Sequence, residues 1–110
     1  LEQKLIVELT ALPNVRWWHR NIVKQDFAIN GFIKHYPDIL IMTQSGKIIL
    51  AETKGDHLKN DNSREKIALG QAWRTAAGKD YRYYMVFEND ENLLSGAVSM
   101  SQFIDTTKAL

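Results

Sequence analysis

The clearest pattern of apolar and polar positions lies in the middle of the chain. Two apolar runs, residues 39–42 and 48–51, flank a polar segment at residues 44–46 that ends in Gly46. Apolar runs of this length around a short polar segment with glycine predict a β-hairpin whose strands are buried on both faces. Gly46 suits the left-handed position of a three-residue turn, because glycine adopts a positive φ without steric penalty.

The register of this hairpin depends on the length of its turn. A three-residue turn pairs Thr43 with Lys47, and the same register places Asp38 opposite Glu52. A two-residue turn would shift the pairing by one residue and send Asp38 to the other face. In the first register Asp38, Glu52 and Lys54 share one face, because strand side chains alternate. The longer turn therefore predicts two carboxylates and one ammonium group at one end of the hairpin.

Helical and extended patterns flank the hairpin. Leucines at helical spacing fill the start of the chain, and aromatic and β-branched residues follow residue 80. The expected elements, in chain order, are a helix over residues 1–12, a strand or bent strand pair over residues 26–36 that pairs with the hairpin, the two hairpin strands, a helix from Asn62 or Ser63 that stops at Gly78, a strand over residues 81–87, and a short helix capped by Ser99 or Ser101. This order predicts an α/β (α+β) fold with a central mixed β-sheet flanked by helices.

The two longer helices each carry an apolar stripe that predicts their buried side. In the second helix the stripe consists of Leu69, Ala72, Trp73 and Ala76. In the first helix Glu8 lies on the same stripe as the leucines. A buried carboxylate needs a partner, because an isolated one is costly. Glu8 is therefore either an edge residue that reaches solvent or a basic partner, or a member of the acidic cluster.

Length and composition are those of one ordinary globular domain. The 110 residues, of which 45% are hydrophobic and 25% charged, predict a single domain over residues 1–110. The lack of cysteine excludes disulfides, thiolate catalysis and cysteine zinc sites, and fits a cytoplasmic location. No apolar run reaches membrane-spanning length, so no membrane partner is expected. The first residue is Leu rather than Met, which indicates a fragment of a longer protein.

A second candidate surface lies at residues 15–21, where two indoles are interleaved with basic side chains. The net charge of +1 does not itself indicate a nucleic-acid binder, because phosphate contacts depend on local positive charge. Interleaved aromatic and basic residues can stack on bases and hold phosphates. Tryptophan is more often a core residue in so small a domain, and we expect one of Trp17 and Trp18 to be buried. Candidate nucleic-acid contacts are Arg16, His19, Arg20 and, beside the acidic cluster, Lys34.

The acidic end of the hairpin calls for a cation. Adjacent carboxylates repel each other, and one of them keeps its proton unless a cation joins them. A divalent metal between Asp38 and Glu52 is the simplest solution. A structural salt bridge from Lys54 to either carboxylate would also explain the trio, without catalysis.

These residues resemble the motif of the PD-(D/E)xK nuclease superfamily. The motif residues, on two adjacent apolar strands, are Pro37, Asp38, Glu52, Thr53 and Lys54. A helix precedes them and a helix–strand unit follows, so the resemblance covers most of the chain in its order of elements. Closer similarity, to the C-terminal nuclease domain of the Res subunits of type III restriction enzymes and of related helicase-fused nucleases, is carried by residues 17–21, 36–38 and 51–55.

The resemblance implies a restriction-endonuclease-like core of order αβββαβ and a metal-dependent endodeoxyribonuclease activity. In such a site Asp38, Glu52 and the backbone carbonyl of Thr53 would bind Mg²⁺ or Mn²⁺. Lys54 would position the attacking water and neutralise charge on the phosphate. Glu8 lies where the superfamily often has an acidic residue on its first helix, and it would bind a second metal or orient a water.

Further implications concern the helix after the hairpin and the partners. Some relatives carry a Q-x-x-x-Y signature on that helix, which marks Gln71 as a candidate DNA contact, although Thr75 stands in place of the tyrosine. DNA is the implied substrate, with helicase or ATPase domains of the same parent chain and a modification subunit as partners. Cuts on opposite strands would require two such sites, as in a homodimer. The alternative is a catalytically inactive nuclease-like fold that binds nucleic acid or protein.

Overall fold

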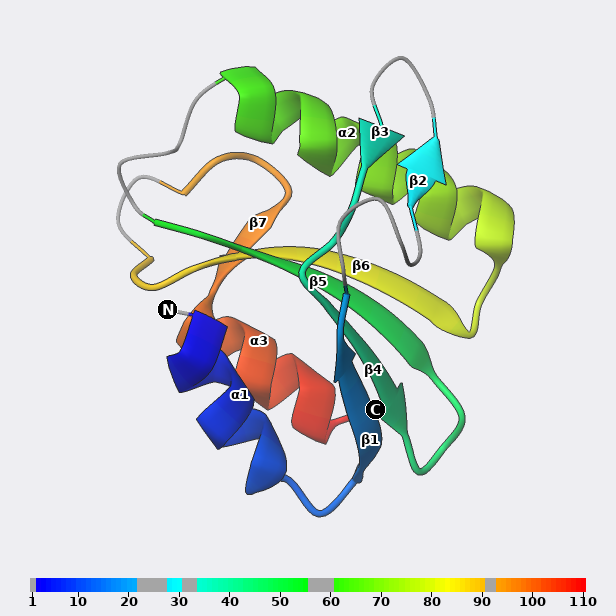
Figure 1. Ribbon diagram of the computed structural model, residues 1–110, viewed down its shortest axis with the longest axis vertical. Helices are drawn as coiled ribbons and strands as arrows, with labels where there is room; N and C mark the ends of the chain where they lie inside the picture. The colour runs from blue at the N-terminus through cyan, green and yellow to red at the C-terminus, as the bar shows by residue number, and fades with distance from the viewer. Residues whose placement is uncertain (1, 22–27, 31–33, 56–60, 91–92) are drawn as a thin grey trace.

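The computed structural model describes residues 2–21, 28–30, 34–55, 61–90 and 93–110. Its elements are α1 (Glu2–Thr10), β1 (Val15–Arg20), β2 (Ile29–Asn30), β3 (Lys34–His35), β4 (Ile39–Thr43), β5 (Ile48–Lys54), α2 (Asp61–Ala77), β6 (Tyr81–Phe87), β7 (Ala97–Ser99) and α3 (Met100–Lys108). These residues form a mixed α/β fold, as predicted, with a mixed sheet and three helices (Figure 1). The sheet has five strands, of which β1 and β7 were not expected. None of the helices in the described ranges is long and apolar enough to cross a membrane.

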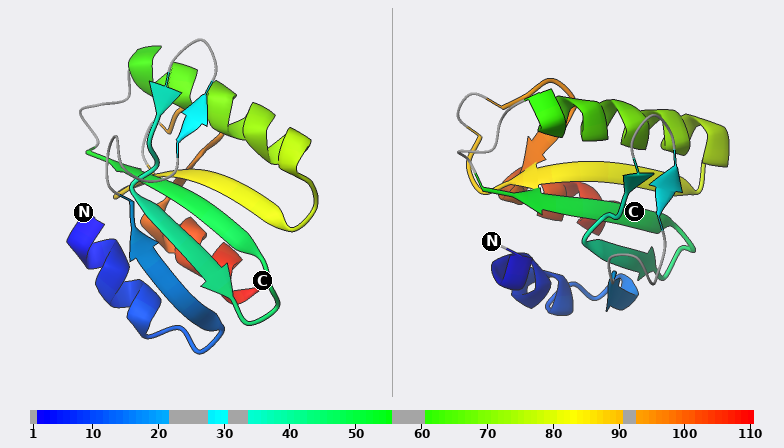
Figure 2. Two further views of the ribbon diagram at one scale, coloured as in Figure 1. Left: turned by 45° about the vertical axis from the view of Figure 1, so that its right-hand side comes forward. Right: turned by 45° about the horizontal axis from the view of Figure 1, so that its top comes forward.

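The five-stranded sheet has the order β1-β4-β5-β6-β7. β4 runs antiparallel to both β1 and β5, whereas the pairs β5–β6 and β6–β7 are parallel. Antiparallel neighbours can be joined by a tight turn, but parallel neighbours need a crossover, which α2 supplies between β5 and β6. α2 covers one face of the sheet, and α1 and α3 lie together on the other (Figures 1 and 2).

The two faces of the sheet bury separate apolar clusters. Because side chains alternate along β5, Ile49 points to the α1 and α3 side and Leu50 to the α2 side. The first cluster consists of Leu5, Leu9, Leu12, Ile39, Ile41, Ile49, Ala51, Val86 and Phe103. The second consists of Ile29, Leu50, Ile67, Leu69, Tyr83, Met85, Phe87 and Leu94. Glu52, two residues beyond Leu50, therefore lies on the α2 side.

The hairpin of β4 and β5 has the register predicted for a three-residue turn. Ile39 pairs with Ala51, and the Thr43 N–H donates to the Lys47 carbonyl at 3.0 Å. Gly46 has a φ of 87°, the left-handed conformation that this turn requires. The two-residue alternative, with its shifted register, is thereby excluded.

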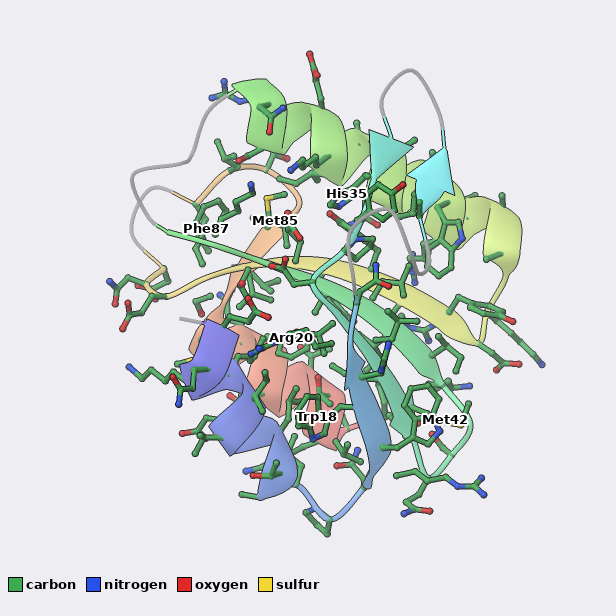
Figure 3. The ribbon with its side chains drawn as sticks, in the orientation of Figure 1. Trp18, Arg20, His35, Met42, Met85 and Phe87 are labelled. Atoms are coloured by element: carbon green, nitrogen blue, oxygen red, sulfur yellow. The ribbon has the colours of Figure 1, made fainter. Side chains whose placement is uncertain are left out.

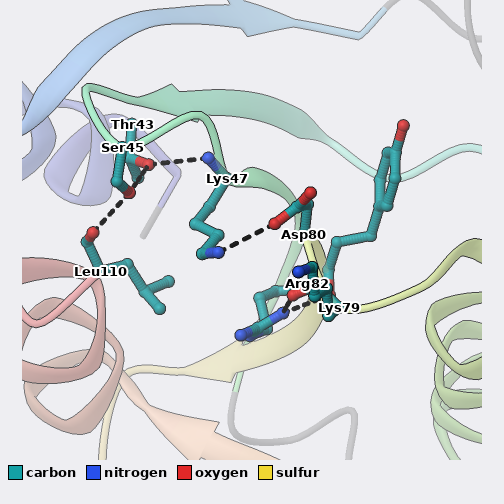
Figure 4. A network of polar contacts seen from close by, with 8 residues as sticks. Thr43, Ser45, Lys47, Lys79, Asp80, Arg82 and Leu110 are labelled. Carbon is teal, nitrogen blue, oxygen red and sulfur yellow. Dashed lines mark hydrogen bonds and ion pairs between the residues drawn. The ribbon is translucent and has the colours of Figure 1, made fainter.

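Polar contacts to two distant parts of the chain hold this turn (Figure 4). The Ser45 hydroxyl lies 2.8 Å from the Thr43 hydroxyl and donates to the backbone carbonyl of Leu110. Lys47 Nζ forms an ion pair with Asp80 Oδ1 at 2.9 Å, just before β6. These contacts fix the turn on which the hairpin register depends.

The neighbour of the hairpin is β1, not the segment predicted at residues 26–36. β1 pairs with β4 from Trp17 opposite Met42 to Arg20 opposite Ile39. The described part of the 26–36 segment forms a separate two-stranded antiparallel sheet, β2 and β3, and the residues between these two strands lie outside the described ranges. The sequence did not predict β1 as a strand, because β1 lies at the edge of the sheet. Its side chains are exposed from residue 16 onward, so they show no apolar alternation.

Only part of the predicted stripe of α2 packs on the sheet, since Leu69 is buried and Trp73 is half-buried against the same apolar cluster. Ala72 and Ala76 are exposed, whereas Ser63 and Gly70 are buried. A Cβ built on Gly70 would lie only 2.3 Å from Cδ1 of Tyr83. The missing side chain lets the helix approach the sheet closely, so Ser63 and Gly70 complete a buried side that also contains Ile67 and Leu69.

The end of α2 and the start of α3 follow the predicted signals, whereas α1 ends at Thr10 and α2 begins at Asp61, each earlier than predicted. Gly78 has a φ of 112°, and its N–H donates to the Arg74 carbonyl at 3.1 Å, which ends α2. Ser99 caps α3, and its hydroxyl accepts a hydrogen bond from the Gln102 N–H at 3.2 Å. α3 is longer than expected and packs beside α1.

Candidate active site

The side chains of Asp38 and Glu52 meet at one end of two inner strands of the sheet, where β4 begins and β5 ends. Ile39 pairs with Ala51, so the same register places Asp38 opposite Glu52. Lys54, two residues beyond Glu52, points to the same face. The structure therefore brings together the three residues that the hairpin pattern predicted to converge.

Backbone groups of two neighbouring strands hold Asp38. Its Oδ2 accepts hydrogen bonds from the Thr53 N–H at 2.8 Å and the Thr53 hydroxyl at 2.9 Å. Its carbonyl accepts from the Asn21 N–H at 2.7 Å. If the ladder of β4 and β5 continued, Pro37 would face Thr53, but proline has no N–H to donate. The Pro37–Asp38 pair thus gives the Thr53 N–H a carboxylate partner and leaves the Thr53 carbonyl outside the ladder.

Glu52 is almost completely buried, with 4% of its surface exposed. Its Oε2 lies 3.7 Å from Lys54 Nζ and 3.5 Å from Lys66 Nζ. Its Oε1 is buried and has no hydrogen-bond partner within the described structure. Burial and the neighbouring Asp38 carboxylate raise the pKa of Glu52 to about 8, against the opposing effect of the two lysines. The carboxylate thus has one ion-paired oxygen and one oxygen without a donor or cation.

Two ammonium groups of different origin lie beside Glu52. Lys54 comes from β5 and Lys66 from the buried side of α2. Burial lowers the pKa of Lys54, the charge of Glu52 opposes this effect, and Lys66 adds to the lowering. Lys66 borders the predicted apolar stripe of α2, where a solvated side chain is the usual expectation, so no role for it followed from the sequence. The small residues Ser63 and Gly70, at helical spacing around it, were the signal that could have placed it on the buried side.

A buried polar pair of His35 and Tyr83 lies on the α2 side of the sheet, where Tyr83 belongs to the apolar cluster. Figure 3 shows His35 beneath α2. His35 Nε2 and the Tyr83 hydroxyl are 2.7 Å apart, and the rings meet edge to face. Burial, together with the charges of Lys66 and Lys54, lowers the pKa of His35 to about 4. Burial raises the pKa of Tyr83, with smaller contributions from the nearby carboxylates. Sequence reasoning missed this pair, since a histidine inside a short strand carries no distinguishing pattern.

Protonation of His35 is expected to destabilise the fold. Its pKa is about 4 in the folded protein and 6.5 in an ordinary environment, so the unfolded chain binds more protons between these values. Stability should therefore fall as the pH drops from 6.5 to 4, by roughly 3 kcal/mol from this residue. Urea unfolding at pH 7 and pH 4 should show this loss relative to His35→Gln, whose neutral amide can still bond the Tyr83 hydroxyl. Equal pH dependence of the two proteins would contradict the prediction.

Glu8 does not join Asp38 and Glu52. It is exposed on α1, which packs on the face of the sheet opposite to α2. The buried residues of α1 are Leu5 and Leu9, and Glu8 lies at the border of their stripe. There it lines a surface hollow of about 300 Å³ together with Glu88, Met100, Ser101, Ile104 and Asp105. Glu8 is therefore a residue at the edge of the helix stripe that reaches solvent, and the expectation that it belongs to the metal site is wrong.

Neither indole of β1 is buried. Trp17 is 41% exposed and Trp18 is 37% exposed, so the prediction that one of them is buried is wrong. The physical reason is the place of β1 as the outermost strand, which has a neighbouring strand on only one side in the described sheet. Large buried aromatic side chains of the core come instead from Tyr83, Phe87 and Phe103.

The predicted nucleic-acid contacts of β1 have different surroundings. Arg16 and His19 are exposed on the strand. Arg20 forms an ion pair with Glu2 of α1, with 2.9 Å between Nε and Oε1. This pair draws Arg20 toward α1 and away from the acidic site.

The other two predicted contacts lie near α2. The backbone of Lys34 belongs to β3, but its side chain lies outside what the structure describes. Gln71 is half-buried on α2, and its carbonyl accepts a hydrogen bond from the Thr75 hydroxyl at 3.0 Å. Thr75 therefore makes a local contact within the helix.

The acidic edge fits a hard divalent cation. Asp38 and Glu52 offer carboxylate oxygens, one of them the unpartnered Oε1 of Glu52. The Thr53 carbonyl points to the same side as its N–H, toward Asp38. Among the described residues no group of three or more His, Cys, Asp or Glu side chains could hold a metal. An ion here would therefore take its other ligands from the backbone and from water, as Mg²⁺ commonly does.

The fold and the site define a mixed α/β protein with two carboxylates and two lysines at one edge of its sheet. Comparisons of the chain with protein-family models, with curated proteins and with solved structures found no match. The function is therefore inferred from the chemistry of the site.

Proposed function

We propose that this chain is a metal-dependent endodeoxyribonuclease domain of the PD-(D/E)xK type. The observation that carries the proposal is the buried, unpartnered Oε1 of Glu52, opposite Asp38 and on the face that carries Lys54. A purely structural ion cluster would be expected to satisfy this oxygen, because an unpaired buried acceptor is costly. A cation at Oε1 would satisfy it and would favour the charged carboxylate.

The order of elements supports the proposal. Apart from the small sheet of β2 and β3, the described elements run α1, β1, β4, β5, α2, β6, β7 and α3. The first six are compatible with the αβββαβ order that the resemblance implies, with β1 in place of the strand expected at residues 26–36. The acidic pair lies on the two central strands of this core, at the edge where β5 ends.

Each residue of the cluster has a role in phosphodiester hydrolysis. Asp38, Glu52 and the Thr53 carbonyl would hold Mg²⁺ or Mn²⁺, which when bound supplies Lewis-acid polarisation of the phosphate and a more acidic water. Lys54 would orient the attacking water, and its lowered pKa suits it to proton transfer. Lys66 pairs with Oε2 of Glu52 and so leaves Oε1 for the cation.

A nuclease-like fold that binds nucleic acid or protein without cutting is the second candidate. The observation in its favour is charge balance, since the ammonium groups of Lys54 and Lys66 equal the two carboxylates in number. The cluster can therefore be neutral without a metal. Under this alternative, Mn²⁺ adds neither stability nor cleavage.

The wider context of the proposed activity rests on the resemblance to Res subunits. The domain would be the cleavage module of a type III restriction or helicase-nuclease enzyme. Helicase or ATPase domains of the parent chain would move the DNA, beside a modification subunit, and two copies of the domain would cut both strands.

Nicking of supercoiled plasmid tests the proposal. Mn²⁺ or Mg²⁺ should support nicking, and a chelator should stop it. Asp38→Asn should nick no more than the chelated wild type, because the amide still accepts hydrogen bonds from Thr53 but loses the charge. Asp105→Asn, on the exposed side of α3, is the matched control and should cut like the wild type. Nicking that is undiminished in Asp38→Asn, or a wild type that neither nicks nor is stabilised by Mn²⁺, would overturn the proposal.

A further inference from the structure

Trp17 lies on the same face of the sheet as the acidic site. β1 pairs with β4 so that Trp17 is opposite Met42 and His19 is opposite Leu40, and the irregularity of β1 comes before Trp17. Opposite residues on neighbouring strands share a face, as do alternate residues of one strand. Every second residue of a strand points to the same face, so Met42, Leu40 and Asp38 share one face. The Asn21 N–H donates to the Asp38 carbonyl, and this bond continues the ladder of β1 and β4 as far as Asp38. Trp17 and His19 therefore stand on the face that carries the carboxylates.

Trp18 and Arg20 belong to the other face. Trp18 pairs with a core residue of the α1 and α3 side, and Arg20 is ion-paired with Glu2 of α1. Figure 3 shows Trp18 and Arg20 on the α1 side of β1 and Met42 on the opposite side. The two neighbouring indoles are similarly exposed, but only Trp17 shares a face with the acidic site.

The surroundings of Trp17 suit a nucleic-acid strand. Its indole is 41% exposed, and the half-buried Met42 beside it extends the apolar surface. Arg16 precedes it, His19 shares its face, and both are exposed. An exposed aromatic ring next to basic side chains is the combination with which single-strand binders stack bases and hold the backbone. The surface thus complements an aromatic base joined to a negative phosphate.

The separation between Trp17 and the acidic site corresponds to a few nucleotides. Met42 and Asp38 are four residues apart, which is about 13 Å along a strand. Phosphates of one DNA strand follow each other every ~3.4 Å along the helix axis. At most about four nucleotides therefore separate a base on Trp17 from a phosphate at Asp38, and one strand can contact both.

We propose that Trp17 stacks on an unpaired base of the DNA strand whose phosphate lies at Asp38 and Glu52. The substrate class is then DNA with a single-stranded segment beside the reacting phosphate, because a base within a continuous duplex has both faces covered by its neighbours. Stacking on Trp17 does not itself require cleavage. Its link to the reacting phosphate rests on the proposed function.

Binding of a labelled oligothymidine of about 20 nucleotides, alone and annealed to oligoadenosine, tests this proposal. Fluorescence anisotropy at low salt with a chelator measures binding without cleavage. Trp17→Ala should weaken single-strand binding about 5- to 150-fold, as expected for loss of one base stack, and leave duplex binding unchanged. Trp17→Phe should retain most of the binding. Trp18→Ala, the matched control on the other face, should bind both forms like the wild type.

Several outcomes would overturn the stacking surface. The first is a wild type that does not bind the single strand. The second is a Trp17→Ala protein that binds the single strand as well as the wild type does. The others are a loss of affinity that is equal in Trp17→Ala and Trp18→Ala, or one that is equal for single strand and duplex. If Trp17→Ala binds normally while nicking depends on Asp38, the stacking surface fails and the proposed nuclease stands. If Trp17→Ala loses the single strand but no metal supports nicking by the wild type, the nuclease fails and the stacking surface stands.

Discussion

Glu52→Gln should make the metal-free protein more stable, by roughly 3 kcal/mol at pH 7. The pKa of Glu52 is raised from an ordinary 4.5 to about 8 in the folded protein. Between these values the folded protein binds more protons than the unfolded chain, so Glu52 lowers stability as the pH rises from 4.5 to 8. Glutamine has the shape of the protonated side chain and no charge to desolvate, so this loss disappears in the variant.

The same substitution should remove the response to metal. In urea unfolding with a chelator, the free energy of unfolding of Glu52→Gln should exceed that of the wild type by less than about 1 kcal/mol at pH 5 and by roughly 3 kcal/mol at pH 7. Mn²⁺ should raise the melting temperature of the wild type but not of Glu52→Gln, which should nick plasmid no faster than the chelated wild type. Glu65→Gln, exposed on α2, controls for loss of a carboxylate and should change neither property. A Glu52→Gln protein less stable than the wild type in chelator at pH 7 would contradict the prediction.

This result would separate a cation site from a structural ion network. In a structural network Glu52 would be charged at pH 7, and removing it would leave two partly buried lysines unpaired at a cost in stability. Here burial and the neighbouring Asp38 outweigh the two lysines. A carboxylate that destabilises the metal-free fold is expected where a bound ligand restores the stability.

The hairpin and its acidic end could be predicted because they depend on local signals. Gly46 and its polar neighbours indicate the turn length, and counting along the strands then pairs Asp38 with Glu52. Register follows from a tight turn because the turn joins residues that are close in the chain. The caps at Gly78 and Ser99 are local in the same sense.

Features that depend on contacts between distant segments did not follow from the sequence. Lys66 meets Glu52, and His35 meets Tyr83, only because segments far apart in the chain pack together on this side of the sheet. The apolar stripe of α2 revealed this packing only in part, since Leu69 and Trp73 pack against the sheet but the close approach depends on the missing side chain of Gly70. The place of β1 at the sheet edge, which exposes Trp17, likewise depends on long-range pairing with β4.

Gly70→Ala should destabilise the protein by about 3 kcal/mol, although alanine is the better helix former. On an exposed helix the exchange would stabilise by about 1 kcal/mol. At this position the new Cβ would lie 2.3 Å from Cδ1, 2.4 Å from Cε1 and 2.5 Å from Cγ of Tyr83. The ring cannot swing away, because it is fully buried and its hydroxyl is bonded to His35. α2 must then move off the sheet, and overpacking of this kind costs about 1–3 kcal/mol or more.

A double-mutant cycle with Tyr83→Leu isolates this contact. Leucine removes most of the ring, so Gly70→Ala should be nearly neutral in that background, and chemical unfolding of the four proteins should give a coupling of at least about 2 kcal/mol. Ala72→Gly, at an exposed position of α2, is the control and should cost about 1 kcal/mol. A Gly70→Ala protein as stable as the wild type would show that α2 does not need this close approach. Because α2 carries Lys66, a helix displaced by the new Cβ would also withdraw its ammonium from the 3.5 Å contact with Glu52.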